Sequence, residues 1–187
     1  IEDGTAFGDR FDAGKLRDLP DDDAAADMYA ATQDICADAG FAAYEVSNHA
    51  RAGCESVHKK IYWTYGDYAG IGPGAHGRLT LNGQRYATEA PLAPAVWLSQ
   101  VSKTGNGDGG REVLSRDDQF VEFLLMGMRL REGVDLSRFQ DCINDKLYFK
   151  IKSLIDLDLV QHDGDSLCLT DKGYPVLNAV LREMLGD

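Results

Sequence analysis

A helix, a glycine and a strand in succession near the start of the chain indicate an α/β fold. Asp21 is the expected helix N-cap, and Asp22 and Asp23 suit the positive end of the helix dipole. The helix should stop at Gly40, and a short strand is expected over residues 42–46. This order is half of a βαβ repeat. The apolar residues that share one helix face are Ala24, Met28, Ala31, Ile35 and Ala39.

Two further elements are expected before a glycine-rich loop. Asn82-Gly83 stands between the short β-prone runs 79–81 and 85–87, which predicts a hairpin with a type I′ turn. A helix follows over about 91–103. Its inward residues should be Leu92, Val96 and Val101.

The run Gly105-Asn106-Gly107-Asp108-Gly109-Gly110 is the best candidate for a domain boundary, because such a composition is flexible. It divides the chain into residues 1–104, with the connecting hairpin, and residues 111–187.

The second part is expected to be mostly helical. Ser115 should cap a buried helix that runs to about Arg131, followed by shorter helices over about 135–144 and 147–157. A hairpin with its turn at 163–165 comes next, and Thr170 should cap the last helix. Helix, helix, hairpin and helix is the order of a winged-helix-like domain.

Charge and cysteine spacing exclude several functions. The 187 residues carry a formal net charge of -12, which disfavours nucleic acid and anionic lipid as partners. No apolar run approaches the roughly 20 residues that cross a bilayer. The four cysteines form no C-x-x-C pair, so a zinc site, an iron–sulfur site or a disulfide framework is not expected. They are Cys36, Cys54, Cys142 and Cys168.

Three long strings in the middle of the chain are distinctive. Residues 44–51 read Y-E-V-S-N-H-A-R, residues 58–63 read H-K-K-I-Y-W, and residues 66–77 read G-D-Y-A-G-I-G-P-G-A-H-G. This sequence closely resembles the radical-SAM family of oxygen-independent coproporphyrinogen III oxidases and their relatives, the radical-SAM haem chaperones (HemN/HemW type). The opening I-E-D-G-T-A-F and the late L-T-D-K-G at 169–173 extend the resemblance over essentially the whole chain. The chaperone branch fits better than the oxidase branch.

The resemblance implies what the chain carries and lacks. The chain would begin late in the family's partial β/α barrel and continue through the C-terminal domain. The family's C-x-x-x-C-x-x-C string, which holds a [4Fe–4S] cluster and with it S-adenosylmethionine, has no match here. The chain alone is therefore expected to be inactive, with no catalytic residue of its own.

The function that the resemblance implies is a cytoplasmic haem chaperone, which binds haem and passes it to haem-accepting client proteins. One alternative is part of a coproporphyrinogen III oxidase, which decarboxylates propionate side chains in haem biosynthesis. Another is a non-catalytic interaction or nucleic-acid-binding module. Against nucleic acid, the lysines Lys146, Lys150 and Lys152 of the expected recognition helix are outweighed by neighbouring aspartates.

His58 is the first candidate binding residue, because imidazole is a common axial ligand of haem iron. If this stretch is helical, Tyr62 lies one turn along the same face, beside Trp63, and the aromatic pair could pack on a flat macrocycle. The family associates this string with haem but has asparagine in place of Lys59. A lysine would weaken binding if the asparagine orients the histidine, and would support it by pairing with a propionate. The residue types alone also fit a surface histidine.

Glu45, Asn48 and Arg51 flank the end of the expected strand, where barrel proteins place ligand contacts. They could bind the amino-acid part of S-adenosylmethionine or a propionate, or form a polar strand end.

The glycines Gly70, Gly72 and Gly74 could let the backbone approach S-adenosylmethionine or substrate closely, or serve a purely structural turn. Residues 72–77 match G-x-G-x-x-G. However, a hairpin rather than a helix follows, which argues against a dinucleotide site.

Two further expectations concern assembly and metal binding. His49, His58 and His76 are spaced too widely for a short metal motif, so only a haem iron contact at His58 is expected. The open strand edges of a partial barrel suggest pairing between two copies as a homodimer.

Overall fold

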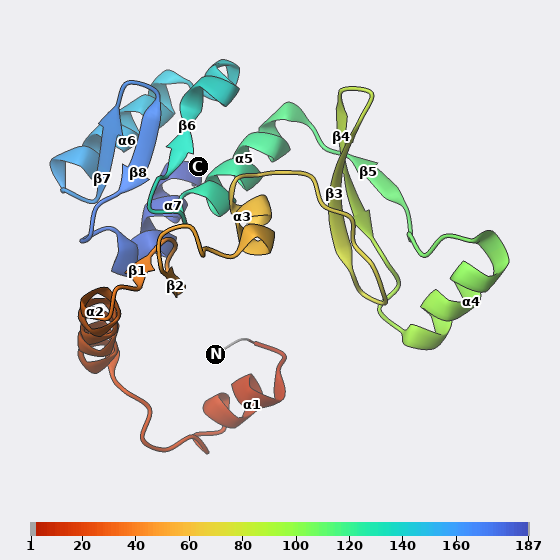
Figure 1. The fold of residues 1–187 in the computed structure, drawn as a ribbon, viewed down its shortest axis with the longest axis horizontal. Helices are drawn as coiled ribbons and strands as arrows, with labels where there is room; N and C mark the ends of the chain where they lie inside the picture. The colour runs from red at the N-terminus through yellow and green to blue at the C-terminus, as the bar shows by residue number, and fades with distance from the viewer. Residues whose placement is uncertain (1–2, 187) are drawn as a thin grey trace.

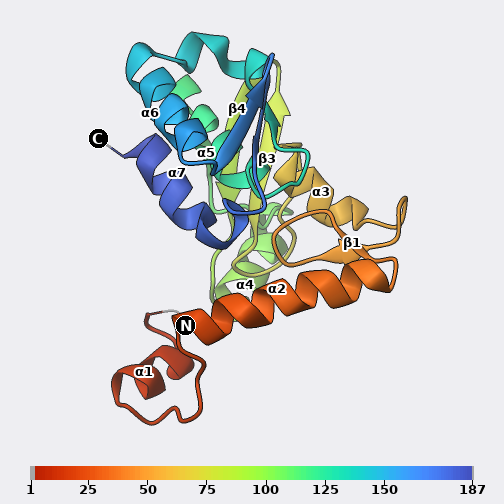
Figure 2. The ribbon, with the colours of Figure 1, turned by 90° about the vertical axis from the view of Figure 1, so that its left-hand side faces the viewer.

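The computed structural model describes residues 3–186 and shows a mixed α/β chain (Figures 1 and 2). Ile1 and Glu2, which open the family-like start, lie outside the described residues. The α-helices are α1 (Ala6–Asp12), α2 (Asp22–Asp38), α3 (Val57–Trp63), α4 (Pro94–Thr104), α5 (Arg116–Gly127), α6 (Asp145–Asp156) and α7 (Leu177–Leu185). Two 3₁₀ helices are η1 (Leu136–Cys142) and η2 (Tyr174–Val176).

The strands of the described chain form small antiparallel sheets. One pairs β1 with β2, the second has the order β3-β4-β5, and the third has the order β6-β8-β7. The strands are β1 (Ala42–Ala43), β2 (His49–Ala50), β3 (His76–Leu81), β4 (Gln84–Glu89), β5 (Arg111–Val113), β6 (Val134–Asp135), β7 (Val160–Asp163) and β8 (Ser166–Leu169).

The main hydrophobic core lies in the C-terminal part. There α5, α6 and α7 pack with the β6-β8-β7 sheet, and the predicted helix, helix, hairpin and helix follow in that order. The side chains buried most completely include Leu124, Met128, Val160, Leu167 and Val180.

The start of the last helix differs from the expectation at Thr170. Helix α7 begins only at Leu177, after η2. Thr170 instead donates its hydroxyl to the carbonyl of Asp158 (2.6 Å) and accepts the N–H of Gly173. Thr170 therefore closes the turn after β8, and residues 171–176 separate it from α7.

Helix α2 begins as predicted, since the Asp21 carboxylate accepts the N–H of Ala24 (2.8 Å) and Gly40 follows with φ +79°. The face that carries Met28 and Ile35 is exposed, however, and no α2 side chain is fully buried. The helix lies along the edge of the molecule in both views, with α1 beyond it (Figures 1 and 2).

The strand expected over 42–46 is shorter in the structure. Only Ala42–Ala43 pair with β2, while Glu45 forms an isolated antiparallel bridge with Leu130. The N–H of Arg131 donates to the carbonyl of Tyr44 (3.1 Å). The chain after β1 therefore pairs with the segment that follows α5.

The predicted hairpin is confirmed as β3 and β4. Leu81 pairs with Gln84, and both turn residues, Asn82 (φ 53°) and Gly83 (φ 79°), have the left-handed conformation of a type I′ turn. The glycine-rich loop connects α4 to β5, and β5 pairs with β4, so the chain returns to the same sheet after α4. The division into 1–104 and 111–187 stays a prediction.

The expectation that Leu92 and Val96 point inward is wrong. They are 77% and 54% exposed. Helix α4 begins only at Pro94, so Leu92 lies before it, and Figure 1 shows α4 at the outer end of the β3-β4-β5 sheet, away from the main core.

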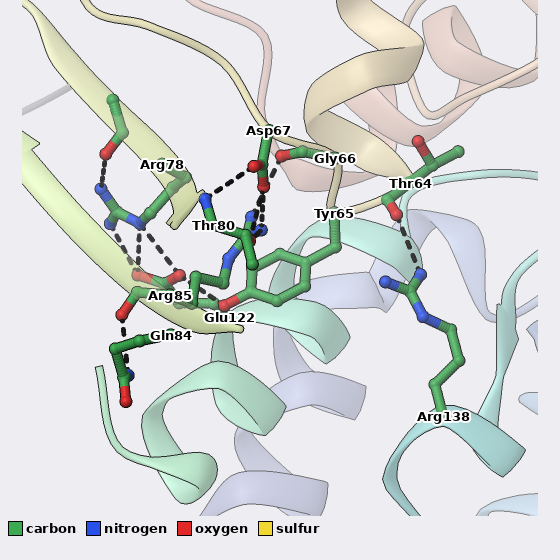
Figure 3. Close-up of polar contacts among 11 residues, drawn as sticks. Thr64, Tyr65, Gly66, Asp67, Arg78, Thr80, Gln84, Arg85, Glu122 and Arg138 are labelled. Atoms are coloured by element: carbon green, nitrogen blue, oxygen red, sulfur yellow. Dashed lines mark hydrogen bonds and ion pairs between the residues drawn. The ribbon is translucent and has the colours of Figure 1, made fainter. Parts of the chain in front are cut away.

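A polar junction joins this sheet to α5 (Figure 3). Arg78 of β3 forms a salt bridge with Glu122 of α5, with Nη2 and Oε1 2.6 Å apart. The Tyr65 hydroxyl donates to the other oxygen of Glu122 (2.9 Å). Burial, and then the hydrogen bond to this carboxylate, raise the pKa of Tyr65 well above its usual value. The phenol therefore stays protonated and remains a donor.

Arg85 of β4 completes the polar junction. Its guanidinium lies 3.9 Å from the centroid of the Tyr65 ring, pairs with Asp67 (2.7 Å) and donates to the carbonyl of Gly66 (3.0 Å). One buried cation therefore fixes the segment that follows α3 against the hairpin.

Replacing Arg85 with methionine should lower the free energy of unfolding by about 2 kcal/mol, because the ion pair and the stacking on Tyr65 are lost together. The matched control is Arg111→Met on β5, since Arg111 is exposed and lies 3.6 Å from Asp108. The control should change stability by less than about 0.5 kcal/mol. Urea unfolding followed by circular dichroism measures both, and equal effects would contradict the junction's importance.

Asp67 should make stability depend on pH. Partial burial acts to raise its pKa, but the hydrogen bonds from Thr80 and the charge of Arg85 outweigh it and hold the pKa below its usual value. Its contribution is present above the unfolded pKa of about 3.9 and is lost as pH falls through the lower folded pKa. The stability gap between the wild type and Asp67→Asn should therefore shrink between about pH 4 and pH 2. A gap that stays constant in urea titrations would contradict this.

Candidate functional site

Helix α3 carries the first group of candidate residues and packs against α5. It begins because the Ser56 hydroxyl accepts the N–H of Lys59 (3.3 Å), the usual N-cap arrangement. It ends at Trp63, and Tyr65 then takes a positive φ of 56° that turns the chain toward the hairpin. The polar junction thus fixes the far end of this helix.

The structure brings His58 and Tyr62 together on an exposed face of α3. Nε2 of His58 lies 2.8 Å from the Tyr62 hydroxyl, and the two rings meet edge to face with centroids 4.7 Å apart. The Tyr62 ring also contacts Tyr68 in the same manner, at 4.4 Å. The result is a row of one exposed imidazole and two half-buried phenols.

Trp63 lies differently. Its indole N–H is buried and has no hydrogen-bond partner among residues 3–186, and the Arg129 guanidinium lies over its ring at 5.2 Å. Trp63 therefore contributes to the packing of α3 near the end of α5, while His58 and Tyr62 face outward.

A chain of polar contacts connects the strand end to α3. Glu45 is only 2% exposed, and its Oε1 accepts the N–H of Ser47 (3.1 Å) and the side-chain amide of Asn48. The amide oxygen of Asn48 accepts from Lys59 Nζ (2.8 Å). Asn48 therefore bridges the buried Glu45 carboxylate and Lys59, the residue that departs from the family string.

Arg51 does not join this group. Its guanidinium lies over the ring of Phe41, 5.0 Å from the centroid, and the side chain is otherwise exposed. Of the three residues expected at the strand end, the structure thus joins Glu45 and Asn48 and places Arg51 elsewhere.

The three candidate glycines have different surroundings. A Cβ on Gly70 would lie 2.5 Å from the carbonyl oxygen of His76, so glycine lets two backbone segments touch. A Cβ on Gly72 (φ +108°) would meet open space, whereas one on Gly74 (φ +68°) would lie 3.0 Å from the Leu92 side chain. The requirement for glycine is steric at Gly70 and conformational at the other two.

The polar junction was missed by the sequence reasoning. Asp67 stands inside the distinctive glycine-rich string, and Arg85 lies in a run that otherwise suits a strand. These positions were the only signals available. Nothing in the local pattern indicates that Glu122 of α5 faces Arg78 across 44 positions of sequence.

Two cavities lie away from the His58 face. One of about 650 Å³ borders the β3-β4-β5 sheet near Arg78 and Arg111, and one of about 620 Å³ lies between α2 and Arg131. Neither is lined by His58, Tyr62 or Trp63.

Residues 3–186 hold no cluster of three or more histidine, cysteine, aspartate or glutamate side chains suited to a metal ion. No helix in this part of the chain has the length and apolar character to span a membrane.

Comparisons with known proteins agree with these sequence features. The family described as the HemN C-terminal domain matches residues 114–176. The Heme chaperone HemW of Lactococcus lactis is 38% identical over 191 residues, which cover 100% of this chain and 48% of that protein. The mitochondrial Radical S-adenosyl methionine domain-containing protein 1 of Mus musculus is 40% identical over 196 residues, covering 99% of this chain and 44% of that protein.

A solved structure shows a similar fold. The radical SAM enzyme coproporphyrinogen III oxidase (HemN) from Escherichia coli matches with a TM-score of 0.66 at 17% identity, covering 91% of this chain and 43% of that one. The chain spans about half the length of the curated relatives it matches. It therefore belongs to the HemW/HemN type of protein, and its C-terminal part is the HemN C-terminal domain.

Proposed function

We propose that this chain is part of a radical-SAM haem chaperone, which binds haem and passes it to haem-accepting client proteins in the cytoplasm. The observation that carries the proposal is the exposed His58 imidazole, paired with the Tyr62 ring on one face of α3. Relatives named Heme chaperone HemW support it.

The proposal extends to the architecture. Helices α5, η1, α6 and α7 with the β6-β8-β7 sheet would form a winged-helix-like domain. Residues 1–104 would supply the last part of a partial β/α barrel, and the exposed apolar face of α2 is consistent with a covered position there. Two copies would pair as a homodimer through open strand edges within residues 1–104.

The residues present fit one axial ligand and one side of a macrocycle. His58 is exposed and reachable, and the Tyr62 ring beside it offers an aromatic edge. Bound haem would supply an iron that can take an imidazole nitrogen as a ligand. The Lys59 ammonium is the nearby cation for a propionate, although it now donates to Asn48.

Trp63 would act by fixing α3 under Arg129 rather than by direct contact with haem.

The described residues do not fit a [4Fe–4S] cluster, because they contain no group of three or more side chains that could hold it. We therefore assign no step through a cluster, and radical chemistry belongs to the proposed complete protein.

Contacts with S-adenosylmethionine are proposed for the backbone at Gly72, where the turn is open, and at Gly74, and for the exposed Arg51. Gly70 would hold that turn in place. Glu45 and Asn48 would position Lys59, since the Glu45 carboxylate is buried and already hydrogen-bonded.

A haem titration followed by absorption tests the proposal. The wild type should bind haem saturably, and His58→Ala should weaken binding about ten-fold or more, because an axial ligand is lost. The matched control is His162→Ala, since His162 is an exposed histidine on β7 and should bind like the wild type.

Equal binding by all three proteins would show that haem binds elsewhere. Decarboxylation of coproporphyrinogen by the complete protein would favour the oxidase alternative, and retention of DNA in a low-salt gel shift would favour a nucleic-acid module.

A further inference from the structure

The imidazole nitrogen that would bind iron already has a partner within the chain. The Tyr62 hydroxyl lies 2.8 Å from Nε2 of His58, a normal hydrogen-bond distance. Because the residues are four positions apart on one helix, the contact forms without any other part of the protein.

The position of the Tyr62 hydroxyl is fixed from the opposite side. The Tyr62 ring packs edge to face on Tyr68, with centroids 4.4 Å apart. Tyr68 is in turn held by a pair of backbone hydrogen bonds with Arg78 of β3 (2.8 and 2.9 Å). The hairpin therefore restrains Tyr62 between Tyr68 and His58, and this limits how far the hydroxyl can move away.

A hydrogen bond and a metal bond at one imidazole nitrogen exclude each other. If Tyr62 donates, its proton occupies the lone pair of Nε2; if it accepts, Nε2 itself carries the proton. In either arrangement, coordination at Nε2 requires the hydroxyl to withdraw.

We propose that the Tyr62 hydroxyl competes with iron for Nε2 of His58 and so sets how tightly the chain holds haem. This inference rests on the proposed haem contact at His58 and deepens it. Such competition suits a protein that must release its ligand to a client, because Tyr62 provides His58 with a replacement partner when iron leaves.

The test is Tyr62→Phe, which removes the hydroxyl but keeps the ring that packs on Tyr68. Haem affinity should rise about two- to ten-fold, the range expected for the loss of one competing hydrogen bond. Adding Tyr62→Phe to the His58→Ala variant should not raise its haem affinity. Tyr148→Phe, at an exposed tyrosine of α6, is the matched control and should leave affinity unchanged.

A second measurement detects the hydrogen bond without haem. The ¹⁵N chemical shift of His58 Nε2 at one fixed pH should change in Tyr62→Phe and stay the same in Tyr148→Phe. An unchanged shift would overturn the inference.

The two proposals fail in different ways. Haem binding of equal strength in the wild type and Tyr62→Phe would overturn the competition and leave the haem site standing. Weaker binding in Tyr62→Phe would show that the hydroxyl assists haem, which also overturns the competition. No haem binding by any of these proteins would overturn the proposed function, and the competition with it.

Discussion

The placement of the β3-β4 hairpin and of α3 depends on the carboxylate of Glu122. This carboxylate accepts from Arg78 of the hairpin and from Tyr65 after α3, and both partners lie far from it in sequence. Because the carboxylate is mostly buried, losing either donor would leave a poorly solvated charge. The polar junction therefore fixes the positions of both the hairpin and α3 on α5. Since α5 belongs to the main core, the hairpin and α3 are held against that core.

The segment between β1 and α3 is fixed to the residues that follow α5. Glu45 bridges Leu130 through its backbone, and its side chain directs Asn48 toward Lys59. The surface that carries His58 is thus attached at both ends to α5 and the residues that follow it. This explains how a short helix of seven residues can present a fixed pair of side chains at the surface.

Features that depend on neighbours in sequence could be predicted. The Asp21 cap, the Asn82-Gly83 turn and the proximity of His58 and Tyr62 each follow from spacing of a few residues. Features that depend on a distant partner could not. The inward direction assigned to Leu92 and Val96 was wrong because periodicity identifies an apolar face but not what covers it. The cap assigned to Thr170 was wrong because a turn and η2 separate Thr170 from the start of α7 at Leu177.

In the candidate site, too, contacts with partners distant in sequence could not be predicted. The sequence groups Glu45, Asn48 and Arg51 by their position at a strand end. In the structure, Glu45 is buried, Asn48 accepts from Lys59, and Arg51 lies over the ring of Phe41. A buried carboxylate needs hydrogen-bond donors, and Asn48 can donate to it while its oxygen still accepts from a cation. Lys59 supplies that cation where the family string has a neutral amide. The Lys59 ammonium already donates to Asn48, so a propionate would have to compete for Lys59 just as iron would have to compete for His58.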